Sequence, residues 1–382
     1  MLQPRAPAAA TPVCANGRLT IRSAKWFLAV YSLALFCLAP LRPLWMDELL
    51  QLSDVYQRTV PDTIARVARN PGGVPLAYVA QNLIVNSLGH PLYTAHIFSI
   101  LCAIAGMASL LWLVRLLSSS ITWPAAAVMT YALLPISLRY AIEARQYGPA
   151  LAASICATAL VVWLDQHPAW WRAHLYGLAL TIGLYLHPYM AFIAIAHALW
   201  AINRPNSRNF VFAACALAAL LFMPWYLYAR TFWVNAVTAG GYQSSLDRKT
   251  PLMMLRELSG GGYFLSIVLV ALAIRGYKRA LRLFLFCIIV PIPLVLAANA
   301  WAHYFFAIRQ LLFIVPPLCL LAAQGLCTLP KPWRPAIAAT LAVIVLGFDI
   351  HLFANSKELS PLWPKDMLLP RSAYPVSLPS AK

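Results

Sequence analysis

The stretch Pro43–Glu48, PLWMDE, directly follows the first long apolar run and sets the interpretation of the whole chain. It places two adjacent carboxylates, Asp47 and Glu48, where a hydrophobic helix is expected to leave a membrane. The chain has only 11 acidic residues among 382, so this placement needs a reason. The stretch alone leaves two interpretations open: an interfacial pair that ends a helix, or a catalytic carboxylate held at the membrane surface.

The composition predicts an all-α polytopic membrane protein. Hydrophobic residues make up 62% of the chain and charged residues 10%, and the mean hydropathy is +0.71. Soluble domains carry about a quarter charged residues. The net charge of +18 does not indicate a nucleic-acid partner, because no polar segment of domain size carries it. It is typical of basic loops that face anionic membrane lipids.

The eight cysteines indicate neither a disulfide framework nor a zinc site. Most of them lie singly within apolar runs, without a Cys-x-x-Cys pair or a His pair at ligand spacing. The first apolar run has a basic lead-in like that of a signal peptide, but no small-x-small cleavage site precedes Arg42. We therefore expect an uncleaved helix there.

Apolar runs that could form membrane spans recur along the chain. They cover 24–42, 92–117, 121–141, 147–164, 172–188, 189–203, 209–229, 261–275, 281–299, 309–327 and 335–352. The sequence thus predicts about eleven transmembrane helices in a membrane domain over 24–352. A cytoplasmic tail, 1–23, precedes this domain, and a polar tail, 353–382, follows it.

The segment 75–88 decides the topology, because it is short and is interrupted by Gln81, Asn82 and Asn86. We expect it to be an amphipathic helix at the membrane surface and not a span. The basic loops 203–209, 275–282 and 330–335 then all lie in the cytoplasm with the N-terminus, as the positive-inside rule requires. The first external loop covers about 43–91, with juxtamembrane helices, and another external loop covers about 230–260. The C-terminal tail falls outside.

This topology brings the unusual polar residues to the external face, from separate helices. Ionisable residues near membrane depth are functional candidates by default. The candidates are Asp47, Glu48, Arg139, Glu143, Arg145, Tyr147, His187, Tyr189, His303, Tyr304 and Arg309.

Each candidate also has a purely structural interpretation. Arg139 and Glu143 are four residues apart and could form a structural ion pair on one helix face. His187 could cap a turn, and Arg309 could extend its charged end to the lipid headgroups. Together, however, the candidates describe carboxylates facing arginines at the bilayer surface.

Transfer of a sugar from a lipid-linked phosphosugar would require this combination. The departing phosphate needs fixed cations, and the planar guanidinium of arginine binds phosphate oxygens bidentately. The acceptor hydroxyl needs a base, which a carboxylate supplies. Direct displacement at the sugar carbon would invert its configuration.

The motifs resemble those of GT-C glycosyltransferases, polytopic enzymes that use polyprenyl-phosphate sugars. The Asp-Glu pair in Trp45–Glu48 resembles the motif of their first external loop. The run Arg139–Pro149, RYAIEARQYGP, is similar to the Tyr-x-x-Glu-Ala-Arg-x-Tyr signature of the bacterial family-39-like members, relatives of the aminoarabinose transferases and protein O-mannosyltransferases.

Two later motifs extend the resemblance over roughly residues 24–330. Leu186–Met190, LHPYM, resembles the Thr-His-Tyr turn of the family, with Pro188 inserted. Phe306–Pro317, FAIRQLLFIVPP, resembles an Arg-Tyr-Leu-x-x-x-x-Pro segment, with Gln310 in place of the usual tyrosine.

The resemblance implies a role for each candidate. Asp47 would be the catalytic base, and Glu48 and Glu143 would orient the acceptor or a metal. Arg145 and Arg309 would hold the donor phosphate. The remaining candidates complete the site: Arg139 and Tyr147 beside the phosphate, and His187, Tyr189, His303 and Tyr304 as substrate-binding residues.

The expected protein is therefore an inverting glycosyltransferase of the bacterial inner membrane that acts on the periplasmic face. Its partners would be a polyprenyl-phosphate sugar, membrane lipids and a lipid, polysaccharide or protein acceptor. No cofactor is implied with certainty, and a divalent metal held by Asp47 and Glu143 stays open. The alternatives are a transporter or lipid flippase and a non-catalytic lipid-binding protein. A transporter is expected to carry its polar residues near the bilayer midplane.

Overall fold

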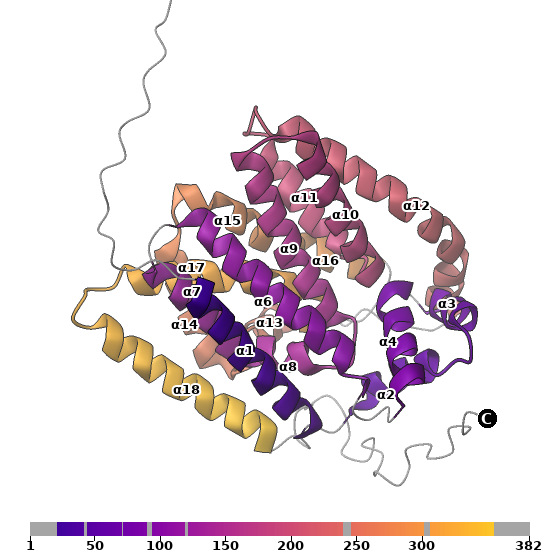
Figure 1. The fold of residues 1–382 in the computed structure, drawn as a ribbon, viewed down its shortest axis with the longest axis horizontal. Coiled ribbons are helices and arrows are strands. Elements are labelled where there is room, and N and C mark those ends of the chain that lie inside the picture. Colours follow the sequence, from indigo (N-terminus) through magenta and orange to yellow (C-terminus); the bar gives the residue numbers. More distant parts are fainter. Residues whose placement is uncertain are drawn as a thin grey trace, which may run out of the picture.

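The computed structural model describes residues 21–41, 44–70, 72–89, 94–118, 121–239, 246–301 and 306–354. All regular structure in these ranges is helical (Figure 1). The helices are α1 (Ile21–Leu38), η1 (Ala39–Leu41), α2 (Met46–Val55), α3 (Val60–Ala68), α4 (Pro75–Leu88), α6 (Ile97–Leu117), α7 (Thr122–Leu133), α8 (Pro135–Ile142), α9 (Tyr147–Gln166), α10 (Trp170–Leu186), α11 (Met190–Ala201), α12 (Arg208–Ala239), α13 (Thr250–Glu257), α14 (Gly262–Gly276), η2 (Arg279–Leu281), α15 (Arg282–Ile289), α16 (Pro291–Trp301), η3 (Ile308–Ile314), α17 (Val315–Cys327) and α18 (Arg334–Ala354).

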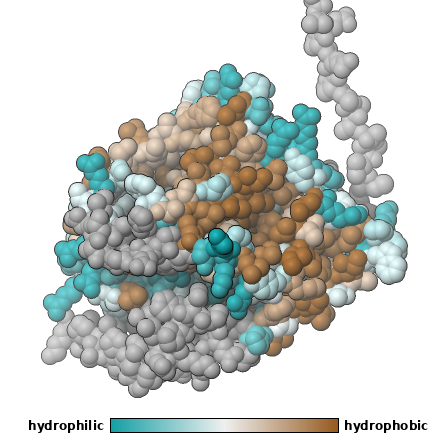
Figure 2. Space-filling model, turned by 180° about the vertical axis from the view of Figure 1, so that it is seen from behind, coloured by the Kyte–Doolittle hydropathy of each residue, from teal (hydrophilic) through white to brown (hydrophobic). Residues whose placement is uncertain are grey.

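Two segments form the centre of the bundle. Within an apolar 18-residue stretch of each segment, 83% of the residues are buried in η3–α17 and 78% in α9, but only 11% in α18 and 22% in each of α1 and α12. Figure 1 shows α9 in the middle, with α12 and α18 at the outside. Figure 2 shows hydrophobic residues across the middle of one face, with hydrophilic residues mainly toward its edges. Such a surface suits contact with lipid tails.

Within the described residues, seven helical segments are long and apolar enough to cross a membrane, or up to nine if each of two bent pairs is one span. Every run that the sequence predicts as a span coincides with one or more of the described helices. Two predicted spans, 172–188 and 189–203, each correspond to a single helix outside this set, α10 with 17 residues and α11 with 12. The all-helical membrane architecture is confirmed, and the count of eleven spans stays a prediction.

The predicted span 121–141 is broken into two helices. The helices α7 and α8 meet at 62°. Leu134 between them is extended, because a residue that precedes proline is disfavoured in the helical region, and Pro135 starts α8. A second bend of 83° separates α13 from α14, where Gly260 and Gly262 adopt positive φ.

The expected external loop 43–91 contains three short helices, α2, α3 and α4, that pack together. The segment 75–88 is the helix α4, as predicted, and its polar residues Gln81 and Asn82 are buried within the protein. The helix α12 runs past this group in Figure 1, and Trp225 Nε1 donates to the Gly73 carbonyl at 3.2 Å. The part of α12 beyond residue 229 lies in the stretch where we expected an external loop.

Small residues let the central helices approach closely. A Cβ on Gly106 of α6 would lie 2.8 Å from the Cβ of Ala152 on α9. Cβ atoms on Gly276 and Gly325 would overlap backbone atoms of α17 and α14 respectively. Such contacts are typical of helix pairs in membranes, where close van der Waals packing drives association.

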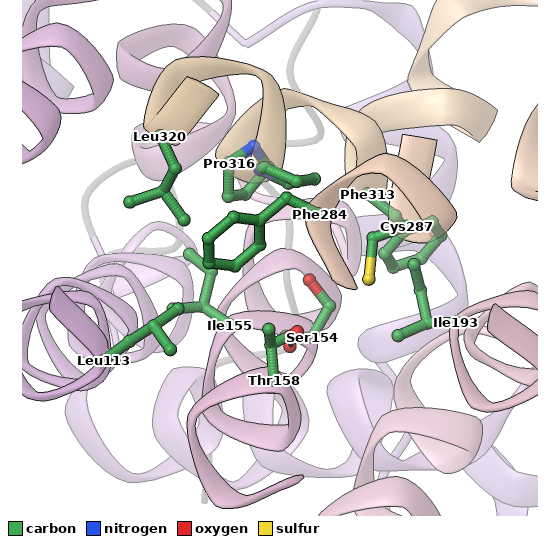
Figure 3. A pocket seen from close by; sticks show the side chains of 11 residues that line it. Leu113, Ser154, Ile155, Thr158, Ile193, Phe284, Cys287, Phe313, Pro316 and Leu320 are labelled. Atoms are coloured by element: carbon green, nitrogen blue, oxygen red, sulfur yellow. Dashed lines mark hydrogen bonds between the residues drawn. The ribbon is translucent and has the colours of Figure 1, made fainter. Parts of the chain in front are cut away.

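The central helices enclose a small cavity of about 10 Å³ between α6, α9, α11, α15 and the η3–α17 segment. Figure 3 shows the hydroxyl groups of Ser154 and Thr158 among apolar side chains. Both hydroxyls donate to carbonyls of their own helix, at 2.8 and 2.7 Å. The cavity has room for about one water molecule, and is too small to hold a sugar or a lipid headgroup.

Candidate active site

The start of α2 carries the two adjacent carboxylates of the opening motif. Trp45 is extended, and its N–H donates to Glu48 Oε2 at 3.0 Å. Acidic side chains in the first turn of a helix also stabilise the positive end of its dipole. The local sequence therefore starts α2 at this point and fixes Asp47 in its first turn.

The turn between α8 and α9 supplies the next group, Glu143 to Tyr147. Glu143 ends α8 in an extended conformation, and α9 begins at Tyr147. The Ala144 N–H donates to Glu48 Oε1 at 2.6 Å, so the Glu48 carboxylate joins this turn to the start of α2. With 0% of its surface exposed, Glu48 acts as a buried connector between two segments.

Asp47 lies between two arginines from distant parts of the chain. Its Oδ2 is 3.1 Å from Arg309 Nη1 and 3.8 Å from Arg145 Nη1. Arg145 Nη1 also donates to the Asp47 carbonyl at 2.6 Å. The three side chains are 9–13% exposed. A carboxylate oxygen carries two lone pairs, so Oδ2 can contact these cations and still accept a proton.

Aromatic rings separate the three arginines. The Trp45 ring lies 5.7 Å from the Arg139 guanidinium carbon and 5.6 Å from that of Arg309. The Tyr147 ring lies 5.8 Å from that of Arg309 and 5.3 Å from that of Arg145. The order Arg139–Trp45–Arg309–Tyr147–Arg145 thus alternates cations with rings. Cation–π contacts of this kind stabilise desolvated cations and orient the guanidinium planes.

Glu143 and Arg139 form the ion pair that their spacing suggests. Arg139 Nε lies 3.8 Å from Glu143 Oε2, and Glu143 is fully buried. Arg139 also contacts the rings of Trp45 and Tyr140. The pair therefore belongs to the same cluster as Asp47 and is not isolated on a helix surface.

His187 and Tyr189 flank this cluster from the turn between α10 and α11. The His187 ring lies 5.6 Å from that of Tyr147, and its Nδ1 accepts the Tyr189 N–H at 3.2 Å. Burial, together with the positive charges of Arg145 and Arg309, lowers the pKa of His187 to about 3. His187 is therefore neutral at physiological pH.

A hydrogen-bonded chain supports the segment that carries Arg309. Tyr189 Oη donates to Asn299 Oδ1 at 3.0 Å, and Asn299 Nδ2 donates to Gln310 Oε1 at 2.6 Å. The same Gln310 oxygen accepts the Ala307 N–H at 3.3 Å. Gln310, which stands where the resembling family has a tyrosine, thus braces the start of η3.

The structure brings most of the predicted residues together. Asp47, Glu48, Arg139, Glu143, Arg145, Tyr147 and Arg309 form one cluster, with His187 and Tyr189 beside it. His303 and Tyr304 lie outside the described residues. Glu48, which was expected to act on substrate, binds backbone N–H groups with both of its oxygens.

Several residues of the site were not predicted. The sequence shows Trp45 only as a neighbour of the Asp-Glu pair. In the structure its ring separates two arginines, Arg139 and Arg309. Asn299, Gln81 and His96 are buried polar residues that hold the surrounding backbone or side chains. A polar side chain within an apolar run is the signal that could have indicated these residues. For Gln81, this signal served only to show that the segment 75–88 is interrupted.

The side chains do not fit a divalent metal. Asp47 and Glu143 each lie against an arginine, whose charge opposes a second cation. Across the ranges that the structure describes, no three His, Cys, Asp or Glu residues come together as a ligand set.

Comparison with solved structures decides the fold. The chain is similar to ArnT, an aminoarabinose transferase, from Cupriavidus metallidurans in the apo state, with a TM-score of 0.63 and 12% identity over 91% of this chain and 68% of that one. ArnT bound to undecaprenyl phosphate gives a TM-score of 0.56 at 10% identity, covering 91% of this chain and 74% of that one. The chain has the GT-C fold.

The oligosaccharyltransferase of Archaeoglobus fulgidus, in a complex with Zn and sulfate, is also similar, with a TM-score of 0.56 and 15% identity. The match covers 87% of this chain and 53% of that one, so this chain spans about half of its length. No family profile and no curated protein sequence matches the chain. The structural likeness confirms the predicted fold of a multi-pass membrane protein with GT-C architecture.

Proposed function

We propose that this protein is a glycosyltransferase that moves a sugar from a polyprenyl-phosphate donor to an acceptor hydroxyl, with inversion at the anomeric carbon. The observation that carries the proposal is the Asp47 carboxylate facing Arg145 and Arg309 at one end of a GT-C bundle. The fold supports a lipid-linked donor, because one of its solved representatives, ArnT, has been observed with undecaprenyl phosphate bound.

Arg145 and Arg309 would bind the donor phosphate. Each guanidinium offers paired N–H groups that match phosphate oxygens, and both are mostly buried, where the attraction between opposite charges is stronger than in water. The rings of Tyr147 and Trp45 hold the Arg309 guanidinium in place. The site is thus organised before the donor arrives, so little energy is spent on arranging it during the reaction.

Asp47 would act as the general base. The acceptor oxygen attacks the anomeric carbon, and its proton passes to Asp47 Oδ2. The bond between the anomeric carbon and the phosphate oxygen breaks, and its electron pair stays on the polyprenyl phosphate. The arginines stabilise the charge that develops on that leaving group. Donor binding also draws the two guanidinium groups toward the phosphate, which lessens their hold on the Asp47 carboxylate.

The other residues of the cluster would position these groups. Glu48 fixes Asp47 relative to the turn that bears Arg145, and the Arg139–Glu143 pair holds the end of α8. His187, which is neutral, and Tyr189 border the cluster. They would form hydrogen bonds with hydroxyl groups of the sugar or the acceptor. The positions of the basic loops favour a site on the external face of a bacterial inner membrane. The acceptor would be a lipid, a polysaccharide or a protein.

Mass spectrometry of envelope glycolipids and polysaccharides tests the proposal. Cells with and without the protein are compared with cells that carry Asp47→Asn. A sugar-sized mass that is lost both in the deletion and in Asp47→Asn is expected. A glycan that the deletion removes and Asp47→Asn restores would overturn the proposal in favour of transport or scaffolding.

A further inference from the structure

Side chains from the first third of the chain hold the backbone between α8 and α9. The Ile142 carbonyl lies 2.6 Å from His96 Nδ1, and the Arg145 carbonyl accepts the Ser99 hydroxyl at 3.2 Å. The Ala144 N–H donates to Glu48, as described above. This short turn therefore carries Arg145 on a backbone that is held by side chains of other segments.

Gln81 of α4 completes this arrangement. Its Nε2 donates to the Ala95 carbonyl at 2.8 Å and to the Ala144 carbonyl at 3.3 Å. Its Oε1 accepts Gln51 Nε2 of α2 at 2.9 Å. Gln81 is 3% exposed and Gln51 is 2% exposed, so water cannot replace these contacts at low cost. One buried amide thus links α2, α4 and the turns at Ala95 and Ala144.

The backbone of Ala144 is consequently held at both its N–H and its carbonyl. Its N–H is bound by Glu48 and its carbonyl by Gln81, and the next residue is Arg145. Arg145 Nη1 then returns to the Asp47 carbonyl. A shift of the Ala144 backbone would move the Arg145 guanidinium relative to both Asp47 and Arg309.

We propose that Gln81 is a positioning residue that sets the Arg145 guanidinium for binding a polyprenyl phosphate, acting through the Ala144 carbonyl. The proposal rests on the proposed function for the identity of the ligand. Gln81 contacts neither reacting group, so its contribution is to the geometry of Arg145 and not to the chemistry itself. Preorganised binding groups of this kind reduce the ordering that a ligand must impose.

The first experiment is a double-mutant cycle with undecaprenyl phosphate as the probe, using the full-length protein in detergent micelles. Gln81→Met removes the amide and keeps the length of the side chain, and is expected to weaken binding about tenfold, the effect of losing a buried hydrogen bond. Arg145→Ala is expected to weaken binding further. The double variant should then bind no more weakly than Arg145→Ala alone.

Asn86→Leu is the matched control. It also replaces a polar side chain of α4 by an apolar one, but Asn86 is exposed, and among the described residues it bonds only the Gln57 carbonyl, at 3.3 Å. The affinity of Asn86→Leu for undecaprenyl phosphate should equal that of the wild type. The proposal would be overturned if the affinity losses of Gln81→Met and Arg145→Ala were additive in the double variant. It would also be overturned if Gln81→Met bound undecaprenyl phosphate with wild-type affinity.

Hydrogen exchange separates this proposal from the proposed function. The amides of residues 143–147 should exchange faster in Gln81→Met than in wild type or Asn86→Leu, with or without ligand. If the wild type fails to bind undecaprenyl phosphate, the proposed function fails, and unchanged exchange in Gln81→Met would also reject the positioning role.

If Gln81→Met does not fold, Gln81→Glu is the second variant that tests the positioning role. A protonated carboxyl can donate to the Ala144 carbonyl, whereas an ionised one repels it. The affinity of Gln81→Glu relative to wild type should therefore be higher at pH 5 than at pH 8. A ratio that does not change with pH would count against the positioning role.

Discussion

The helix α9 has an aspartate–arginine cluster at each end, and the two clusters differ in how they are built. At its start, Arg145 and Arg309 meet Asp47. At its end, Arg204 Nη1 lies 3.5 Å from Asp165 Oδ2. The 20 residues of α9 span about 30 Å, the thickness of a membrane interior, so the two clusters lie far apart.

The cluster at Asp165 has the features of a local structural brace. Asp165 and Arg204 are 19% and 41% exposed, and Ser207 Oγ donates to Asp165 Oδ1 at 2.6 Å. Both partners come from one short turn between α11 and α12. Each carboxylate oxygen has its own partner, so the group is already satisfied and has no evident capacity for a ligand.

The cluster at Asp47 places more positive charge around one buried carboxylate. Two arginines from different segments share it, and their side chains are only 12–13% exposed. Bringing these cations together in a buried position is costly unless an anion is bound there or the charges are otherwise compensated. The two clusters thus use the same residue types differently: at Asp47 the cations converge from distant segments, and at Asp165 the partners are neighbours in one turn.

Asp47→Asn is expected to have the largest effect. Loss of a general base lowers the rate of transfer by about 10²–10⁴-fold. Binding of undecaprenyl phosphate should persist, because both arginines remain. Transfer measured on purified protein in detergent, with Asp165→Asn as the control from the other end of α9, checks this. Near-normal turnover in Asp47→Asn would remove Asp47 as the base.

Arg309→Ala is expected to weaken binding of undecaprenyl phosphate by about 10–100-fold, because hydrogen bonds to a charged group are lost. Arg309→Lys should lose less, since it keeps the charge but not the planar fork. Affinity is measured for both variants beside the wild type. Equal affinity in all three proteins would mean that Arg309 only reaches toward headgroups and binds no phosphate.

The resemblance of the motifs to those of GT-C enzymes predicted the fold, and the predicted topology placed most of the candidate residues on one face. The spacing of apolar runs indicated the helical membrane domain, and the motifs at Asp47, Glu143 and Arg309 indicated a shared site. These features depend on residue type and order, which can be read from one chain. The alternation of arginines with Trp45 and Tyr147 could not be predicted, because it depends on the distances between side chains from different segments.

Glu48 shows where sequence interpretation reached its limit. Its position next to Asp47 suggested a second catalytic carboxylate. Whether a carboxylate is free to act or is occupied by backbone N–H groups depends on which segment approaches it, and Ala144 lies 96 residues away. The break at Leu134–Pro135 was likewise hidden, because average hydropathy does not register a change of helix direction.

Burial of His187 is expected to make the stability of the protein depend on pH, with a smaller effect than the variants above. Its pKa is lowered to about 3 in the folded protein, whereas an unfolded histidine titrates near about 6.5. The unfolded state therefore binds the proton first, and the stability contributed by neutral His187 is present above about pH 6.5 and is lost as the pH falls toward 3. His187→Gln should flatten the fall of the melting temperature between pH 7 and 4.

The control for this prediction is His174, an exposed histidine of α10 toward the other end of the bundle. His174→Gln should leave the pH profile of the wild type unchanged. If both variants had the same slope as the wild type, the acid sensitivity of the protein would not arise from the burial of His187.

Arg204→Ala is expected to have the smallest effect of the series. The Asp165–Arg204 pair is partly exposed, and such pairs contribute about 0–1 kcal/mol to stability. Ser207 would still bind Asp165, although the contact of Arg204 with the Trp200 ring, at 4.8 Å, would be lost. Melting temperature and transfer rate are measured side by side, and the rate should equal that of the wild type. A loss of transfer as large as that of Arg309→Ala would contradict the distinction between the two clusters, because an ion pair at the far end of α9 would then control the chemistry that we propose for Asp47, Arg145 and Arg309.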